Sequence, residues 1–265
     1  MIEKFRAAKA AEIARLLDQE KTHSLPEPYE GERPDFIRSL WETGPGAVIA
    51  EYKRASPSKG QINLAASPEQ IAQAYKEAGA AALSVLTEET YFQGSLEFLK
   101  RMQGAGLPML RKDFILHPLQ IIETAATPAS AVLLIARMLK PRELAHLLAL
   151  AQAVDLACVV EVCDEDDLEK AQGVSPDIIQ VNNRDLDKLT TDLAVSERLI
   201  AFKREDQLWI SASGMAKPQD IDRVVQAGFD AVLVGTSLMS GADPGAALKN
   251  LIKGRGSAPA PLGGQ

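Results

Sequence analysis

The sequence has few of the side chains that form disulfide frameworks or metal centres. Its 265 residues include two cysteines, Cys158 and Cys163, and three histidines. Two cysteines are too few for a disulfide framework, and their odd spacing along one expected strand predicts that they point to opposite faces, so we expect buried, reduced thiols. The histidines His23, His117 and His146 show no ligand spacing, which argues against a metal site.

Long apolar runs and an excess of basic charge are also missing. No stretch approaches the roughly 20 apolar residues that span a bilayer, and residues 1–21 lack the apolar centre of a signal peptide. We therefore expect a cytoplasmic protein without a membrane partner. The net charge of −7 argues against nucleic acid, because a phosphate backbone needs a basic face. A phosphorylated small molecule remains open, since a few lysines and backbone N–H groups can bind one phosphate.

Short runs of small and β-branched apolar residues recur along the chain, with helical stretches between them. They are near-continuous rather than alternating, which is typical of parallel strands covered on both faces. The predicted strands are 47–51, 82–86, 108–111, 131–135, 157–161, 178–182, 209–213 and 231–235. Eight consecutive strand–helix units predict an α/β fold, a single (β/α)8 barrel, and 265 residues is a typical length for one.

Helix-start signals and a faint repeat lie between these runs. Caps or first-turn prolines at Ser67, Pro118, Pro141, Asp164 and Pro218 predict the starts of helices. Residues 78–85 and 227–234 repeat one unit, in which a glycine ends a helix before a strand that opens on alanine. Such recurrence favours a closed ring of similar units, and an open doubly wound sheet is the alternative.

The predicted barrel occupies residues 46–253. Residues 1–45 contain an amphipathic helix at about 2–20 and a Pro- and Glu-rich stretch at 26–34, which we interpret as a helical extension packed over one barrel end. Residues 254–265 are rich in glycine, proline and alanine, so we expect a disordered tail.

Polar residues stand at the ends of several predicted strands, where this fold carries its catalytic groups. They are Glu51, Lys53, Lys112, Glu161, Asn182 and Arg184. A network of ion pairs that only stabilises the barrel is the alternative interpretation. Unpaired buried charges cost several kcal/mol each, so six polar strand ends on one rim favour a functional site.

Small residues follow the seventh and eighth strands, where backbone N–H groups can approach an anion closely. Ser213-Gly214 and Gly235-Thr236 stand in the two loops that usually hold phosphate in this fold. Ser56, in the first loop, is placed to close over the same anion together with Lys59. A pair of ordinary tight turns is the alternative.

Six segments carry a resemblance to a known family. They lie at 48–60 (VIAEYKRASPSKG), 83–88, 91–95, 110–115 (LRKDFI), 181–186 and 234–239. From about residue 36 to 252 the chain resembles indole-3-glycerol phosphate synthase, and the two segments spelled out are highly specific to that family. The resemblance implies a carbon–carbon lyase of tryptophan biosynthesis that needs neither cofactor nor metal. Its substrate is 1-(2-carboxyphenylamino)-1-deoxyribulose 5-phosphate, which closes to an indole ring with loss of carbon dioxide and water.

The resemblance also implies a role for each candidate residue. Lys112 matches the general acid that protonates the reacting carbonyl, and Glu161 its partner in the later proton removal and dehydration. Glu51 and Lys53 match the pair that holds the substrate carboxylate and anilino nitrogen. The remaining matches are Asn182 and Arg184, which orient hydroxyls and the aromatic acid, and Phe92, Phe114 and Leu133, which form an apolar wall for the ring.

Lysine and glutamate also suit the chemistry on physical grounds. Ring closure delivers a proton to oxygen and builds positive character on nitrogen. A lysine near other cations has a lowered pKa, so we expect Lys112 to become a usable acid near neutral pH. A nearby carboxylate can then take protons and stabilise the cation.

The chain departs from the family pattern at Ala212, where a glutamate is usual in a Ser-Glu-Ser-Gly run. The absence of this carboxylate from the polar strand ends puts the reaction rate or the orientation of the substrate in question. Four other departures, at Tyr52, His117, Leu119 and Ser130, are interpreted as tolerated packing or surface changes.

Two other functions remain as alternatives. A phosphoribosylanthranilate isomerase-like enzyme would need a cysteine or aspartate acid–base pair where Lys53 and Glu161 stand. A non-catalytic phosphate-binding barrel is the other alternative, and the missing glutamate at position 212 permits it. For the assembly we expect a monomer or a weak homodimer.

Overall fold

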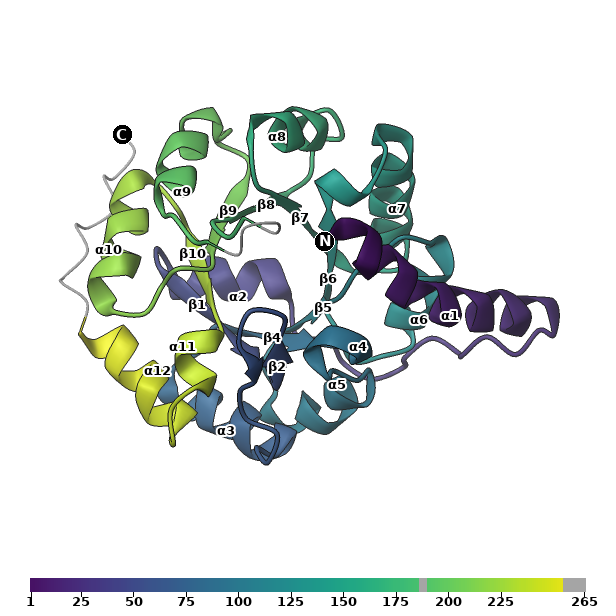
Figure 1. The fold of residues 1–265 in the computed structure, drawn as a ribbon, viewed down its shortest axis with the longest axis horizontal. Coiled ribbons are helices and arrows are strands. Elements are labelled where there is room, and N and C mark those ends of the chain that lie inside the picture. Colours follow the sequence, from purple (N-terminus) through teal and green to yellow (C-terminus); the bar gives the residue numbers. More distant parts are fainter. Residues whose placement is uncertain (186–189, 255–265) are drawn as a thin grey trace.

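The computed structural model describes residues 1–185 and 190–254, which form a closed barrel inside a ring of helices (Figure 1). All eight barrel strands are parallel, and the order around the barrel is β1-β10-β9-β8-β7-β6-β5-β4, with β4 pairing back to β1. The strands are β1 (Ala47–Tyr52), β4 (Ala82–Leu86), β5 (Met109–Lys112), β6 (Ala131–Ile135), β7 (Ala157–Val162), β8 (Ile178–Asn182), β9 (Leu208–Ala212) and β10 (Ala231–Val234). A two-stranded hairpin of β2 (Ala55–Ser56) and β3 (Gly60–Gln61) follows β1.

The (β/α)8 prediction is confirmed, and every predicted strand lies within one residue of its observed limits. The third strand begins at Met109 instead of Pro108. Proline has no N–H to donate to a ladder, although the Pro108 carbonyl still accepts a hydrogen bond from Leu83 N at 2.9 Å. Of the predicted tail, Gly254 is described and residues 255–265 lie outside the described residues.

The helices begin where the cap signals predict. Ser67 accepts a hydrogen bond from Gln70 N, Asp164 accepts one from Asp167 N, and the three prolines stand in first turns. The helices are α1 (Ile2–Lys21), α2 (Phe36–Thr43), α3 (Pro68–Ala78), α4 (Glu89–Phe92), α5 (Glu97–Met102), α6 (Pro118–Ala125), α7 (Pro141–Ala153), α8 (Glu165–Gln172), α9 (Ala194–Leu199), α10 (Pro218–Ala227), α11 (Thr236–Met239) and α12 (Pro244–Lys253). Three short 3-10 turns lie at Gln103–Ala105, Ala136–Met138 and Ile200–Phe202.

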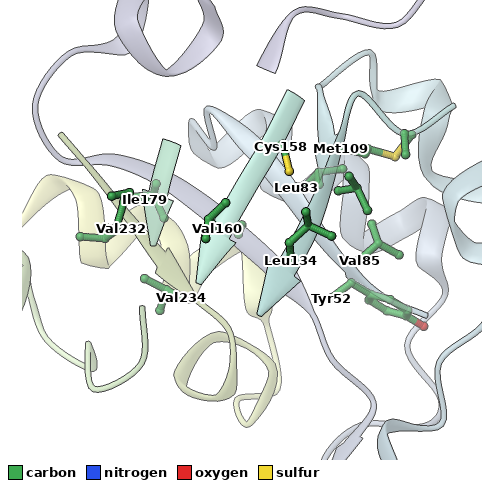
Figure 2. Close-up of a cluster of buried hydrophobic side chains, with 14 of the residues drawn as sticks. Tyr52, Leu83, Val85, Met109, Leu134, Cys158, Val160, Ile179, Val232 and Val234 are labelled. Carbon is green, nitrogen blue, oxygen red and sulfur yellow. The ribbon is translucent and has the colours of Figure 1, made fainter. Parts of the chain in front are cut away.

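Strand residues alternate between two apolar cores. Figure 2 shows part of the outer core, in which Tyr52, Val85 and Val160 point from the strands toward the surrounding helices. The intervening residues, among them Ile49 and Leu133, fill the inside of the barrel. Because the alternation continues to the strand ends, it decides which polar residues face the barrel mouth.

The first 45 residues contact both ends of the barrel. Phe36 and Leu40 of α2 pack on residues at the starts of the strands, such as Ala47 and Ala231, and α2 lies behind the barrel in Figure 1. Helix α1 lies beside α6 and reaches the opposite end, where Phe5 joins the inner core. That end carries the candidate site.

The two cysteines are buried or half-buried, and one of the histidines caps a helix. Both thiols are free, Cys158 in the outer core and Cys163 half-buried beyond the end of β7. Burial raises the pKa of both thiols. His117 caps α6, since its Nδ1 accepts a hydrogen bond from Leu119 N at 3.2 Å. Within residues 1–185 and 190–254 no group of three histidine, cysteine or acidic side chains is arranged to hold a metal, and no helix has the length and apolarity to cross a bilayer.

Candidate active site

A pocket opens at the carboxyl ends of the strands. It brings together thirteen of the fourteen residues selected from the sequence, namely Glu51, Lys53, Phe92, Lys112, Phe114, Leu133, Glu161, Asn182, Arg184, Ser213, Gly214, Gly235 and Thr236. Ser56 is the exception, because it is buried in β2 and its Oγ accepts a hydrogen bond from Lys59 N at 3.2 Å. Lys59 does not line the pocket either, so the first loop does not close over it in this structure.

The floor of the pocket is an ion pair between β5 and β7. Lys112 Nζ lies 2.9 Å from Glu161 Oε2, and the two side chains are 17% and 2% exposed. Burial disfavours both charges, but each charge stabilises the other. The pKa of Glu161 is lowered, despite burial, by Lys112 and by hydrogen bonds from Asn182 and Gln180.

The structure corrects the expected acidity of Lys112. A lowered pKa was expected from neighbouring cations, whereas the pKa of Lys112 is raised. Burial does act to lower it, but the attraction of Glu161 and Glu51 outweighs burial. The reason is that the ends of β1, β5 and β7 meet around one pocket, so the carboxylates of Glu51 and Glu161 lie near the Lys112 ammonium. Lys112 therefore carries its proton throughout the neutral pH range.

Three donors surround the Glu161 carboxylate. Its Oε2 accepts from Lys112 and from Gln180 Nε2 at 2.6 Å, and its Oε1 accepts from Asn182 Nδ2 at 3.0 Å. The amide of Asn182 cannot turn without loss, because its Oδ1 accepts from Ser213 Oγ at 2.9 Å and from Arg184 N at 3.1 Å. The carboxylate is thus fixed in place and charged.

A second ion pair lies in the pocket at the end of β1. Lys53 Nζ is 3.1 Å from Glu51 Oε1, and Ser84 Oγ donates to Glu51 Oε2 at 3.3 Å. The Lys53 ammonium also lies 5.8 Å from the centroid of the Phe92 ring, within reach of a cation–π interaction. This lysine can therefore bind a carboxylate attached to an aromatic ring that packs on the same wall.

The aromatic wall includes a residue that the sequence did not reveal. Phe5 of α1 stacks on Phe114 with ring centroids 4.2 Å apart, and it lies 6.4 Å from the Phe92 centroid. Phe5 lines the pocket together with Phe92, Phe114 and Leu133. Its only sequence signal was a place on the apolar stripe of α1, which any docked helix would show.

Glu88 fixes the end of this wall. Its buried carboxylate accepts hydrogen bonds from the N–H groups of Thr90, Tyr91 and Phe92 at 2.7 to 3.1 Å, and so caps α4. A capping carboxylate holds the short helix against the pocket. Glu88 is therefore a structural support for Phe92, although it stands at a strand end like the catalytic candidates.

The opposite wall is built from backbone. Ser213 and Gly214 line the pocket and have φ values of +68° and +92°, so the chain makes a tight turn there. Gly235 is the N-cap of α11, and Asn183 Nδ2 secures the neighbouring turn by donating to the Ser213 carbonyl at 3.1 Å. Backbone N–H groups in this arrangement suit a phosphate.

Comparison with known proteins decides the family. The family model described as indole-3-glycerol phosphate synthase matches residues 2–251. The chain belongs to the indole-3-glycerol phosphate synthase family. The synthase of Shouchella clausii is 41% identical over 255 residues, which is 95% of this chain and 97% of that protein. The synthase of Listeria monocytogenes serovar 1/2a is 40% identical over 256 residues, 94% and 97% of the two chains.

More distant structures share the fold alone. A crystal structure of 3-hexulose-6-phosphate synthase superposes with a TM-score of 0.59 at 16% identity, covering 79% of this chain and all of the other. Membership of the indole-3-glycerol phosphate synthase family carries a lyase chemistry of tryptophan biosynthesis, and an isomerase-like alternative no longer fits.

Ala212 remains the departure from the pattern expected of this synthase family. Its side chain is buried in the pocket wall, beside Asn182 of β8 and Leu233 of β10 in the strand register. The Lys112–Glu161 and Lys53–Glu51 pairs form without any carboxylate at 212. Both ion pairs of the pocket are therefore present although position 212 carries no charge.

Gly235 is required by a close approach of Glu51. A Cβ at 235 would lie 2.3 Å from Glu51 Oε1 and 3.0 Å from its Cβ. Gly235→Ala should therefore displace Glu51 and narrow the anion turn, by which we mean the backbone at 213–214 and 235–236. We expect the KM for substrate to rise roughly tenfold or more, equivalent to about 1.4 kcal/mol of binding free energy. Gly104→Ala is the control, because nothing lies within 4 Å of a Cβ there. Equal KM values for the two variants in steady-state assays would contradict this.

Proposed function

We propose that this chain closes the indole ring of indole-3-glycerol phosphate through the Lys112–Glu161 pair. The observation that carries the proposal is the 2.9 Å contact of a protonated lysine with a charged glutamate at the floor of the pocket. An aromatic wall lies on one side of this pair and a backbone anion turn on the other. An acid–base pair between an aryl site and a phosphate site suits a substrate that carries both groups.

Binding fixes the substrate at its two ends. The phosphate accepts hydrogen bonds from backbone N–H groups at 213–214 and 235–236, while the aryl ring packs on Phe5, Phe92 and Phe114. Lys53 pairs with the ring carboxylate, and Glu51 accepts from the anilino N–H. Asn182 and Arg184 contact the sugar hydroxyls and the aromatic acid. Held in this way, the aryl carbon and the ketone carbon can meet.

Ring closure uses Lys112 as the acid. The aryl carbon that bears the carboxylate attacks the ketone carbon, the new carbon–carbon bond forms, and Lys112 gives its proton to the ketone oxygen. The nitrogen gains positive charge, which Glu51 and Glu161 stabilise from buried positions. Loss of carbon dioxide returns an electron pair to the ring and removes that charge.

Dehydration completes the indole. Lys112 first takes a proton from solvent and then gives it to the new hydroxyl, which leaves as water, while Glu161 removes a proton from the neighbouring CH2 carbon. The 2.9 Å contact lets the two residues exchange a proton between turnovers. Carbon dioxide and water are the only other products.

The pH dependence of kcat/KM follows from the two pKa directions. The pKa of Lys112 is raised above its ordinary 10.5 and that of Glu161 is lowered below 4.5, so both keep the required charge at every pH between these values. We expect kcat/KM to be flat between about pH 7 and 9, with a fall below about pH 6 as the substrate phosphate gains a proton. A pH–rate profile with a basic limb below pH 9 would contradict this.

The activity itself is tested with the anilino-deoxyribulose phosphate as substrate. The purified chain should produce indole fluorescence in steady-state assays, with one carbon dioxide released for each indole formed. Binding of substrate without fluorescence would favour the non-catalytic barrel and overturn the proposal. We further propose that the enzyme works in the cytoplasm as a monomer or weak homodimer without nucleic acid, and light scattering of the purified chain tests the assembly state.

A further inference from the structure

Helix α1 carries a stripe of charges that lies against the end of β5. Lys9, Glu12 and Arg15 are spaced by three residues and share one face of the helix. They meet Arg111, Asp113 and Glu123, which come from β5, the residue just after it, and α6. The six side chains hold three positive and three negative charges, so the cluster is balanced.

The contacts form one continuous network. Lys9 Nζ lies 2.8 Å from Asp113 Oδ1 and also pairs with Glu12. Arg111 Nη2 lies 3.2 Å from both Glu12 and Asp113, and its Nη1 lies 3.2 Å from Glu123. Arg111 is fully buried and Lys9 is 3% exposed, so water cannot replace a missing partner.

The residues directly before and after Lys112 both belong to this network. Because strand residues alternate, Arg111 points outward to α1 and α6, while Lys112 points into the pocket. Asp113 contacts Lys9 of α1 and also lines the pocket. The strand ends at Lys112, so Asp113 lies beyond the β5 ladder. Side chains hold the backbone there instead: Asp113 Oδ1 accepts from Phe114 N at 2.8 Å, and Asp113 Oδ2 accepts from Thr87 Oγ1 at 2.5 Å.

Lys9 is the only member of the cluster from α1 that contacts Asp113 among the described residues. Without it, Asp113 would keep Arg111 and Thr87 but lose its link to α1, and Glu12 would keep Arg111 as its cationic partner. A buried carboxylate that loses one of its cationic partners shifts toward the donors that remain, here Arg111, Thr87 and the Phe114 N–H. Such a shift displaces the peptide that follows Lys112.

We propose that Lys9 is a positioning residue, which holds the backbone after β5 through Asp113 and so places the Lys112 ammonium for proton transfer. This inference rests on the proposed function, because it concerns the same ring closure. It makes α1 part of the catalytic apparatus in a second way, separate from the contact of Phe5 with the aryl ring.

The test is a comparison of kcat and KM in three variants. Lys9→Met keeps the length of the side chain and removes its charge, and a misplacement of about 1 Å in a reacting group lowers kcat by roughly 10- to 100-fold. We expect that fall with KM within about threefold of the parent. Phe5→Leu should raise KM with a smaller change in kcat, since it removes aryl contact. Lys4→Met, an exposed lysine on the same helix, should match the parent.

The outcomes separate the two proposals. If the parent chain does not turn over, the proposed function fails. If the parent is active and folded Lys9→Met has a kcat within about twofold of it, or loses activity only through KM, the Lys9 inference is overturned. If Lys9→Met does not fold, Asp113→Asn keeps the shape of the side chain and removes its charge. A kcat for Asp113→Asn equal to that of the parent would equally overturn the inference.

Discussion

Replacing Lys112 with methionine should lower kcat by about 1,000-fold, within the range for loss of a general acid. Methionine has nearly the same length and no proton to give, so the ketone oxygen must take its proton from water. KM should change little, because Phe5, Phe92 and the anion turn still bind the substrate. Single-turnover measurements with enzyme in excess would isolate the ring-closing step.

The matched control for this loss is Lys140→Met. Lys140 is exposed at the start of α7 and does not line the pocket, so its removal should leave kcat and KM unchanged. Circular dichroism should show both variants folded. A folded Lys112→Met enzyme that retains more than about a tenth of the parent kcat would contradict the role of Lys112 as the acid.

Replacing Glu161 with glutamine should lower kcat by about 100- to 1,000-fold. Three donors surround this carboxylate, from Lys112, Gln180 and Asn182. Glutamine can place its oxygen toward Lys112 and Gln180, but its NH2 group then faces the Asn182 NH2 group. Asn182 cannot turn to accept, because its oxygen already serves Ser213 and Arg184. The variant therefore loses the base and the fixed geometry together.

A second signature should accompany the loss at Glu161. The Lys112 ammonium would lose its nearest counter-charge, and its pKa would fall because burial is then less opposed. We expect the residual activity of Glu161→Gln to decline at a lower pH on the basic side than the parent activity does. Glu169→Gln, an exposed change on α8, is the control. An unshifted basic limb in pH–rate profiles would contradict the coupling of the two residues.

The barrel and most of the pocket could be predicted because they follow from local rules. Buried parallel strands read as apolar runs, and the fold places function at their carboxyl ends, so Lys112, Glu161 and Asn182 could be selected without coordinates. Small residues after the last two strands pointed to the proposed phosphate site for a similar reason, since they let backbone N–H groups approach an anion closely.

The features that sequence reasoning missed depend on contacts between distant parts of the chain. Phe5 joins the pocket only because α1 docks beside α6, more than 100 residues along the chain. The raised pKa of Lys112 depends on which carboxylate the barrel closure brings nearest, and no spacing rule gives that distance. Ser56 stays a prediction as a phosphate contact, because the β2–β3 hairpin buries it outside the pocket lining. Leu186, at the end of the sixth-strand motif, lies outside the described residues.

The most direct test is a crystal structure with the substrate analogue whose ketone is reduced to an alcohol, since that analogue keeps the aryl and phosphate groups but has no carbonyl to attack. We expect the Lys112 ammonium within about 3.2 Å of the alcohol oxygen, hydrogen-bond reach for a proton donor. The aryl ring should pack on Phe5 and Phe114, and the phosphate should lie in the turn of Gly214 and Gly235. An analogue bound with its phosphate at the Lys53 side, or with Lys112 out of reach of that oxygen, would contradict the assignment of the site.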